Sequence, residues 1–170
     1  MVDNNEVHRF YENLINKLNP ITKDDYIKIL SLGTGTGVWN NNQDVMFRSG
    51  IITLKDIISN RDDLYEYLIN HNISDDMALE IMTFIRRGRG FSDFDVINNC
   101  TDLRLKKIWN DPKRLKKWNY YKEVMNENKC DDWVIDVCSN IIFLPERSMA
   151  IEEYMRITKN DSIPFDINNI

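Results

Sequence analysis

The sequence predicts an all-α protein that forms a single multi-helix domain. Apolar side chains recur at three- and four-residue spacing through most of the chain, which places them on one face of a helix. Ser, Thr, Asp or Asn precedes several of these segments, where such side chains cap helix N-termini. The alternation of apolar and polar residues that marks a half-buried strand is not found over a convincing length.

The N-terminal part of the chain predicts three helices. Apolar periodicity indicates a first helix over residues 6–18, which ends before Pro20 because the residue preceding a proline avoids helical backbone. Thr22 is suited to cap the second helix, whose first turn is acidic. A glycine-rich turn follows over residues 33–37, and we expect a short helix over residues 38–48.

The middle of the chain contains the clearest helix. Shorter helices are predicted over residues 53–58 and 62–70, and a longer one over residues 74–88. Ser74 is a good N-cap for the longer helix, and Gly88 with Gly90 ends it. Its buried stripe has three- and four-residue spacing and consists of Met77, Ala78, Ile81, Met82 and Ile85.

Residues 91–110 contain the least informative pattern of the chain. Beyond them, Asn110 or Asp111 is suited to cap a long helix, with Pro112 at an allowed first-turn position. The apolar residues of that helix recur at helical spacing and include Leu115, Trp118 and Met125.

Two further helices are predicted over residues 131–142 and 147–158. We see no linker, repeat or low-complexity tract, and 170 residues are enough to bury a core. We therefore expect one domain over residues 1–159, followed by a loosely ordered tail over residues 160–170.

The composition is that of a globular protein, with 42% hydrophobic and 29% charged residues. No apolar run approaches the ~18–20 residues of a membrane span, and the N-terminus lacks the features of a signal peptide. Cys100, Cys130 and Cys138 are widely spaced, which suits a reducing compartment better than a disulfide framework. We therefore expect a cytoplasmic protein that does not interact with membranes.

Charge is distributed unevenly along the chain. Residues 1–85 carry 7 Lys or Arg against 13 Asp or Glu, residues 86–122 carry 11 against 4, and residues 123–170 carry 4 against 10. The basic segment is either a local surface for a polyanion or a solvated face that the acidic flanks neutralise. Charge counting leaves both interpretations open.

Two groups of basic residues within this segment are candidate phosphate contacts. The first group crowds the end of the 74–88 helix and consists of Arg86, Arg87 and Arg89. Arginine presents a planar fork to phosphate, although cations at a helix C-terminus also complement its dipole without any ligand. The second group lies on exposed faces of the helix after Pro112 and includes Lys113, Arg114, Lys116 and Lys117.

The glycine-rich turn is a candidate contact to the DNA backbone. Leu32-Gly-Thr-Gly35 lies between two predicted helices and is close to the hydrophobic-Gly-x-Gly hairpin of helix-hairpin-helix modules. Gly33, Thr34 and Gly35 would then let backbone N–H groups approach a phosphate. The alternative is a tight structural connection. No strand precedes the turn and no Gly-Lys-Ser/Thr follows it, which excludes Rossmann and P-loop motifs.

The sequence predicts no catalytic residue, metal site or cofactor. Asp93 and Asp95 imitate the carboxylate pair of polymerase palms, but a palm places these groups on a strand with a third carboxylate, and no strand is predicted here. His8 and His71 lie in no recognisable triad or zinc-binding motif.

Four blocks of sequence, taken in order, carry a likeness to a known family. The blocks are residues 33–39, 51–68, 78–90 and 132–138. Their order and approximate spacing resemble the fingers region of the PolC-type DNA polymerase III alpha subunit. The resemblance extends over about residues 20–145, with extra chain around residues 95–120.

The resemblance implies an all-α fingers domain that closes over an incoming nucleotide. Arg61 matches the family arginine of the Arg-Asp-Asp block. Arg86, Arg87 and Arg89 match the basic cluster that ends the Ala-x-x-Ile-Met helix. These arginines are the implied phosphate contacts.

The chain departs from the family pattern after Pro145. Glu146 and Ser148 stand where the family has a lysine and a histidine, and Arg147 compensates in part as a further phosphate contact. A carboxylate near a triphosphate is repulsive, so the resemblance implies weakened nucleotide binding.

The implied function is a fingers-like module of DNA replication that binds DNA backbone, such as primer-template DNA, or nucleotide phosphate. Without a palm the chain is not a polymerase on its own. One alternative is a non-catalytic interaction module that mimics the fingers and engages a replication protein. Another is a polymerase piece that works with a palm-bearing chain. The Met1 start, the 146–148 departures and the extra chain around 95–120 favour a stand-alone relative.

Overall fold

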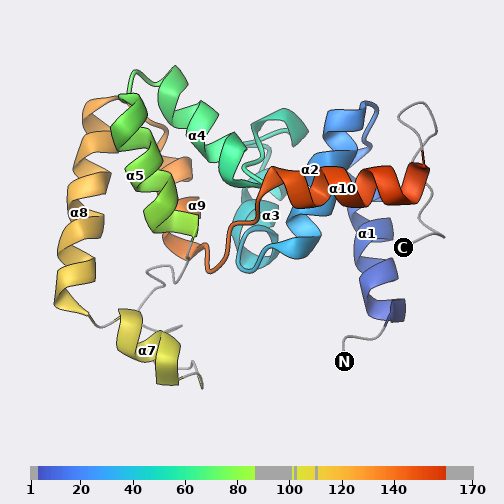
Figure 1. Cartoon of the computed structure of the whole chain (residues 1–170), viewed down its shortest axis with the longest axis horizontal. Helices are drawn as coiled ribbons and strands as arrows, with labels where there is room; N and C mark the ends of the chain where they lie inside the picture. Colours follow the sequence, from blue (N-terminus) through green and yellow to red (C-terminus); the bar gives the residue numbers. More distant parts are fainter. Residues whose placement is uncertain (1–3, 87–100, 102, 110, 160–170) are drawn as a thin grey trace.

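The computed structural model describes residues 4–86, 101, 103–109 and 111–159, and this part of the chain is helical (Figure 1). The all-α prediction is therefore confirmed. The elements in chain order are α1 (Asn4–Leu18), α2 (Lys23–Thr34), a π-helical turn η1 (Trp39–Gln43), α3 (Asp44–Arg48), a 3-10 turn η2 (Leu54–Asp56), α4 (Arg61–Asn70), α5 (Asp75–Arg86), α7 (Leu103–Trp109), α8 (Pro112–Glu127), α9 (Asp132–Asn140) and α10 (Arg147–Thr158).

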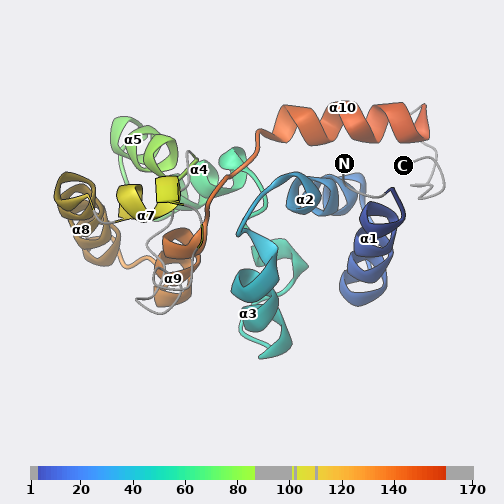
Figure 2. The same ribbon diagram turned by 90° about the horizontal axis from the view of Figure 1, so that it is seen from below.

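The helices form two groups at opposite ends of the molecule (Figures 1 and 2). One group contains α4, α5, α8 and α9, and the other contains α1, α2 and α10, with η1 and α3 between them. α10 packs along α2, and α4 packs against α5. Residues 141–146, which we call the strap, run without helix from α9 to α10 and join the two groups.

Local capping explains why several helices begin where the sequence predicts. Thr22 and Asp25 form a capping box at the start of α2. The carboxylate of Asp111 accepts a hydrogen bond from the N–H of Lys113 at 3.0 Å, which starts α8 with Pro112 in its first turn. The bounds of α10 agree with the predicted range, residues 147–158.

Two sequence predictions of local structure need correction, and one further helix was not predicted. The helix predicted over residues 38–48 is broken, because Asn41 has φ of 56° and interrupts the helical backbone between η1 and α3. The helix predicted over residues 53–58 is only the short turn η2. The helix α7 lies in the segment whose pattern we could not interpret.

Some predictions fall outside the described residues. The helix predicted over residues 74–88 is described as α5 as far as Arg86, and its two glycines lie beyond that point. Asp93, Asp95 and the 160–170 tail also lie outside the described part of the chain.

Aromatic side chains hold α8 against α5. The rings of Phe84 and Trp118 stack with centroids 6.0 Å apart and planes 6° from parallel. Tyr121 meets Phe84 edge-on at 5.1 Å, and its hydroxyl donates to the Glu80 carboxylate at 3.0 Å. Trp118 and Tyr121 are both fully buried, so this seam anchors the basic helix α8 to the rest of the fold.

Two buried amides fix the chain after the glycine-rich turn. The Gln43 side chain donates to the carbonyls of Val38 at 2.9 Å and Ile58 at 2.8 Å, and accepts from the N–H of Ile58. Asn42 donates to the carbonyls of Gly37 and Val137. These contacts satisfy backbone groups that would otherwise be buried without partners.

The two described cysteines are expected to be unreactive in the folded protein. Burial raises the pKa of the Cys130 thiol to about 11 and that of the Cys138 thiol to about 12. Because the thiolate is the nucleophile and a raised pKa depletes it at neutral pH, alkylation at about pH 8 should be slow at both. Site-resolved mass spectrometry after iodoacetamide treatment checks this. Rapid native labelling of Cys130, at the rate of the unfolded chain, would contradict it.

Candidate phosphate-binding site

The strap gathers three of the arginines that the sequence singled out. The N–H of Leu144 donates to the carbonyl of Arg86 at 3.3 Å, and the N–H of Arg61 donates to the carbonyl of Pro145 at 3.0 Å. Arg147 opens α10 directly after the strap. Segments far apart in the sequence therefore meet at the junction of α4, α5 and α10.

Arg61 is held by three groups of the strap. Its Nε donates to the carbonyl of Leu144 at 2.9 Å, and Nη1 donates to the carboxylate of Glu146. The guanidinium also lies 5.8 Å from the ring centroid of Phe143. The Arg61 side chain is 16% exposed, whereas that of Glu146 is 55% exposed. The arginine is thus fixed by the chain itself rather than projecting into solvent.

The other two described arginines at this junction differ in their surroundings. Arg147 donates to the carboxylate of Asp24 at 2.8 Å, so it too pairs with an acidic residue. Arg86 is half-buried, and its Nε is buried with no hydrogen-bond partner among the described residues. Arg87 and Arg89 lie outside the described part of the chain.

The glycine-rich turn does not have the predicted hairpin geometry. Gly33 and Thr34 are the last two residues of α2, and Gly35 is its C-cap. A Cβ at Gly33 would lie 2.0 Å from the hydroxyl oxygen of Tyr11, so this glycine makes room for a buried ring. The turn is therefore a tight structural connection, and its contact with DNA remains a prediction.

The glycine turn is instead paired with the strap. Thr36 and Phe143 form an antiparallel β-bridge, with N–H···O distances of 3.0 Å in both directions. Thr36 also accepts from the N–H of Ile142 at 3.0 Å. These bonds position the strap against the glycine turn.

The four candidate residues on α8 divide into two pairs. Arg114 lies 4.3 Å over the ring of Phe84, and Lys117 lies 3.7 Å from the carboxylate of Glu80, so both pack against α5. Lys113 and Lys116 are exposed, and neither forms an ion pair within the described part of the chain. Together with Tyr120, which is 50% exposed, they share one face of α8.

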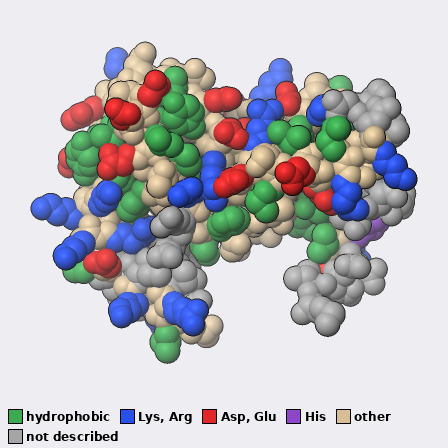
Figure 3. All heavy atoms as spheres, viewed as in Figure 1, with side chains coloured by type: hydrophobic (Ala, Val, Ile, Leu, Met, Phe, Trp, Pro, Cys, Tyr) green, Lys and Arg blue, Asp and Glu red, His purple; other side chains and the backbone are tan. Residues whose placement is uncertain are grey.

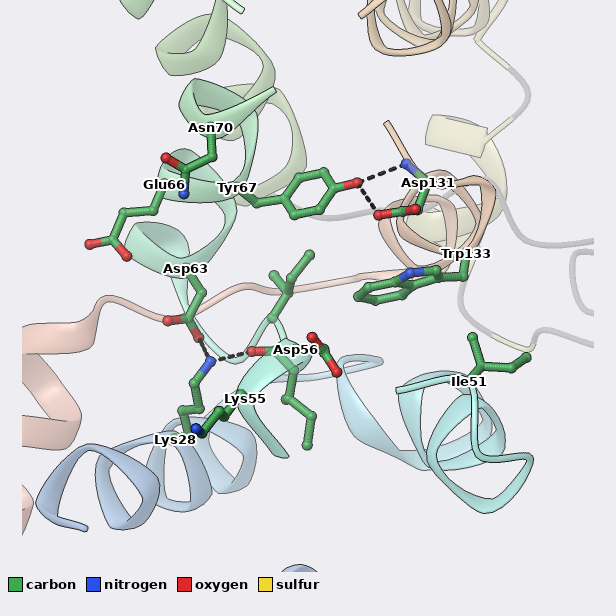
Figure 4. A pocket seen from close by; sticks show the side chains of 12 residues that line it. Lys28, Ile51, Lys55, Asp56, Asp63, Glu66, Tyr67, Asn70, Asp131 and Trp133 are labelled. Carbon is green, nitrogen blue, oxygen red and sulfur yellow. Dashed lines mark hydrogen bonds and ion pairs between the residues drawn. The ribbon is translucent and has the colours of Figure 1, made fainter. Parts of the chain in front are cut away.

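A cavity of about 320 Å³ between α4 and α9 was not foreseen from the sequence (Figure 4). Two pairs of its polar groups are partnered within the chain: Lys28 pairs with Asp63 at 3.2 Å, and the Tyr67 hydroxyl donates to Asp131 at 2.8 Å. Burial raises the pKa of the Tyr67 hydroxyl above its ordinary value. We interpret these contacts as a structural link between α4 and α9, with Trp133 forming one wall.

The described residues contain no group of three or more His, Cys, Asp or Glu placed to hold a metal ion. Among these same residues, no helix is long and apolar enough to cross a membrane.

Comparison with curated proteins gives consistent matches. A relative from Caldanaerobacter subterraneus, named DNA polymerase III PolC-type, is 27% identical over 143 residues, which is 84% of this chain and 8% of the relative. The chain is similar to a short segment of PolC-type DNA polymerase III. The protein of this name from Staphylococcus epidermidis is 29% identical over 141 residues, 83% of this chain and 8% of the relative.

Sequence identity to PolC-type polymerase is higher over a shorter stretch. The Halalkalibacterium halodurans protein is 37% identical over 82 residues, 48% of this chain and 6% of its own length. The chain thus spans less than a tenth of the PolC-type proteins it matches. No protein-family model matches the chain.

Proposed function

We propose that this chain is a fingers-like module of DNA replication that binds the DNA phosphate backbone through α7 and α8, without catalysing nucleotidyl transfer. The likeness to PolC-type DNA polymerase III supports a role in replication. The basic surface of the two helices supports DNA as the ligand.

The observation that carries this proposal is the composition of α7 and α8. Together these helices contain eight Lys or Arg residues and two Glu residues. Lys and Arg side chains gather over the lower left of the molecule, where α7 and the start of α8 lie (Figure 3). Lys113 and Lys116 share a face of α8 with an exposed aromatic ring, Tyr120, and bases stack on such rings while cations contact the backbone.

The test is a titration of fluorescently labelled primer-template DNA with the protein at about 50 and 200 mM salt, followed by anisotropy. The double variant Lys113→Gln/Lys116→Gln is expected to bind more weakly. The slope of log affinity against log salt should fall by about 2, because each lysine that neutralises a phosphate contributes about one unit.

A matched control carries the same charge change elsewhere. Arg9 and Lys55 are exposed residues outside α7 and α8, so Arg9→Gln/Lys55→Gln should keep the wild-type slope. Wild-type binding that is absent at low salt, or equal loss in both double variants, would overturn the proposal.

A second candidate function is a protein-interaction module that mimics the polymerase fingers. A groove of about 400 Å³ on α5 and α8 is lined in part by Leu79, Phe84 and Lys117. Leu79 is 52% exposed and Leu115 is 44% exposed, which favours contact with an apolar partner surface. Capture of replication proteins that Leu79→Glu abolishes, with no DNA binding by the wild type, would favour this function.

A further inference from the structure

The N-termini of α4 and α10 meet at the strap. Arg61 is the first residue of α4, Arg147 is the first residue of α10, and the N–H of Arg61 contacts the carbonyl of Pro145 just before α10. Helix N-termini carry partial positive charge, and two arginines add to it. This corner therefore attracts anions.

The anions found at this corner belong to the chain itself. Glu146 is the N-cap residue of α10, and its Oε1 accepts from Arg61. Its Oε2 lies 3.5 Å from the hydroxyl of Ser148. The carboxylate of Asp24 accepts from Arg147 at 2.8 Å. Each arginine thus has one carboxylate partner from a distant or neighbouring element.

The arginine at the centre of the corner has little freedom to serve another ligand. Its Nε is bound to the carbonyl of Leu144, and its side chain is only 16% exposed. A phosphate that approached Arg61 would have to displace the carboxylate of Glu146 and then remain close to that carboxylate's charge. Like charges at such a distance repel each other.

We propose that the Glu146 carboxylate occupies the position of an anionic ligand at this corner, and so closes the corner to free nucleoside triphosphates. Glu146 is then a specificity-determining residue: polymeric phosphate binds at α7 and α8, and the triphosphate of a single nucleotide is excluded from Arg61. Only the statement that DNA binds at α7 and α8 rests on the proposed function. The closure of the corner does not, because the contacts of Arg61 do not involve those helices.

The test compares triphosphate binding by the wild type and the Glu146→Gln variant of the full chain. The probe is a fluorescent dATP analogue with Mg²⁺, followed by anisotropy. The wild type should show no saturation, and the variant should bind at least about tenfold more tightly, because Gln keeps the size of Glu and removes its charge. Adding Arg61→Gln to the variant should abolish the gain.

Two further variants make the result specific. Glu152 is an exposed acid on α10, so Glu152→Gln removes the same charge away from the corner and should leave triphosphate binding at the wild-type level. Glu146→Ala serves as a second variant should Glu146→Gln fail to fold. Wild-type binding as tight as that of the variants, or no gain in any folded Glu146 variant, would overturn the proposal.

A parallel titration of the wild type with primer-template DNA separates this proposal from the proposed function. If the wild type fails to bind DNA while the triphosphate results are as expected, only the role of α7 and α8 is rejected. If the affinity for the dATP analogue does not change when Glu146 is replaced, the closure of the corner is rejected, whether or not the wild type binds DNA.

Discussion

Replacing Trp118 with alanine is expected to lower the free energy of unfolding by about 3–5 kcal/mol. The indole is 1% exposed and stacks on Phe84, which also carries Arg114 on its ring. Truncation leaves a cavity in the seam between α5 and α8 and removes a partner from Phe84. Since α8 is a basic helix that buries only Trp118, Tyr121 and Met125, its position depends on this seam.

Chemical denaturation of Trp118→Ala and of Tyr120→Ala measures this effect. Tyr120 lies on the same helix, is 50% exposed, and should change the stability by about 0.5 kcal/mol or less. A loss for Trp118→Ala no larger than that for Tyr120→Ala would mean that the seam does not anchor α8. The same pair of variants informs the DNA titration, because Tyr120→Ala alters the proposed binding face and leaves the stack of Trp118 on Phe84 in place.

The helices whose limits depend on neighbouring residues could be predicted from the sequence. α2 begins at Thr22 and α8 at Asp111 because a side chain caps the backbone three or two residues ahead. The buried residues of α5, including Ile81 and Ile85, follow the helical period. Such signals are local, so they are contained in the sequence without knowledge of the fold.

Features that depend on distant contacts could not be predicted. The break at Asn41 occurs where Asn42 reaches the carbonyl of Val137, 95 positions away in the chain. The strap has no helical or strand pattern, because its backbone bonds go to Thr36, Arg61 and Arg86 rather than to a regular neighbour. Hydrophobic periodicity does not report bonds of this kind.

The candidate site shows the same division. The sequence singled out Arg61 as a phosphate contact and Glu146 as a departure from the family pattern, but not that the two side chains pair across 85 positions. It placed Arg114 and Lys117 on an exposed basic face; Lys117 is 53% exposed, whereas Arg114 is only partly exposed and lies over the Phe84 ring. Charge counts identify a basic segment, and only the packing of α8 shows which of its cations face solvent.

Replacing Gly37 with alanine is expected to lower the free energy of unfolding by roughly 2–5 kcal/mol, from two additive causes. Gly37 has φ of 68°, where an L-residue is strained by about 1–2 kcal/mol. A Cβ there would also lie 2.6 Å from the carbonyl oxygen of Asn140 and 3.2 Å from the backbone nitrogen of Ile142. That contact forces the glycine turn away from the strap and costs a further ~1–3 kcal/mol.

Gly50 provides a matched control for the second cause. Its φ is 72°, and a Cβ there would meet nothing within 4 Å, so Gly50→Ala should cost only the backbone strain of about 1–2 kcal/mol. Both substitutions reduce the entropy of the unfolded chain alike, and this contribution cancels in the comparison. Equal losses in urea denaturation would show that the end of α9 yields freely at Asn140. A larger loss of stability for Gly37→Ala would show that the backbone near Asn140 and Ile142 is rigid. Since the strap that follows orients Phe143 and Arg61, the arginine corner would then be a fixed feature of the fold.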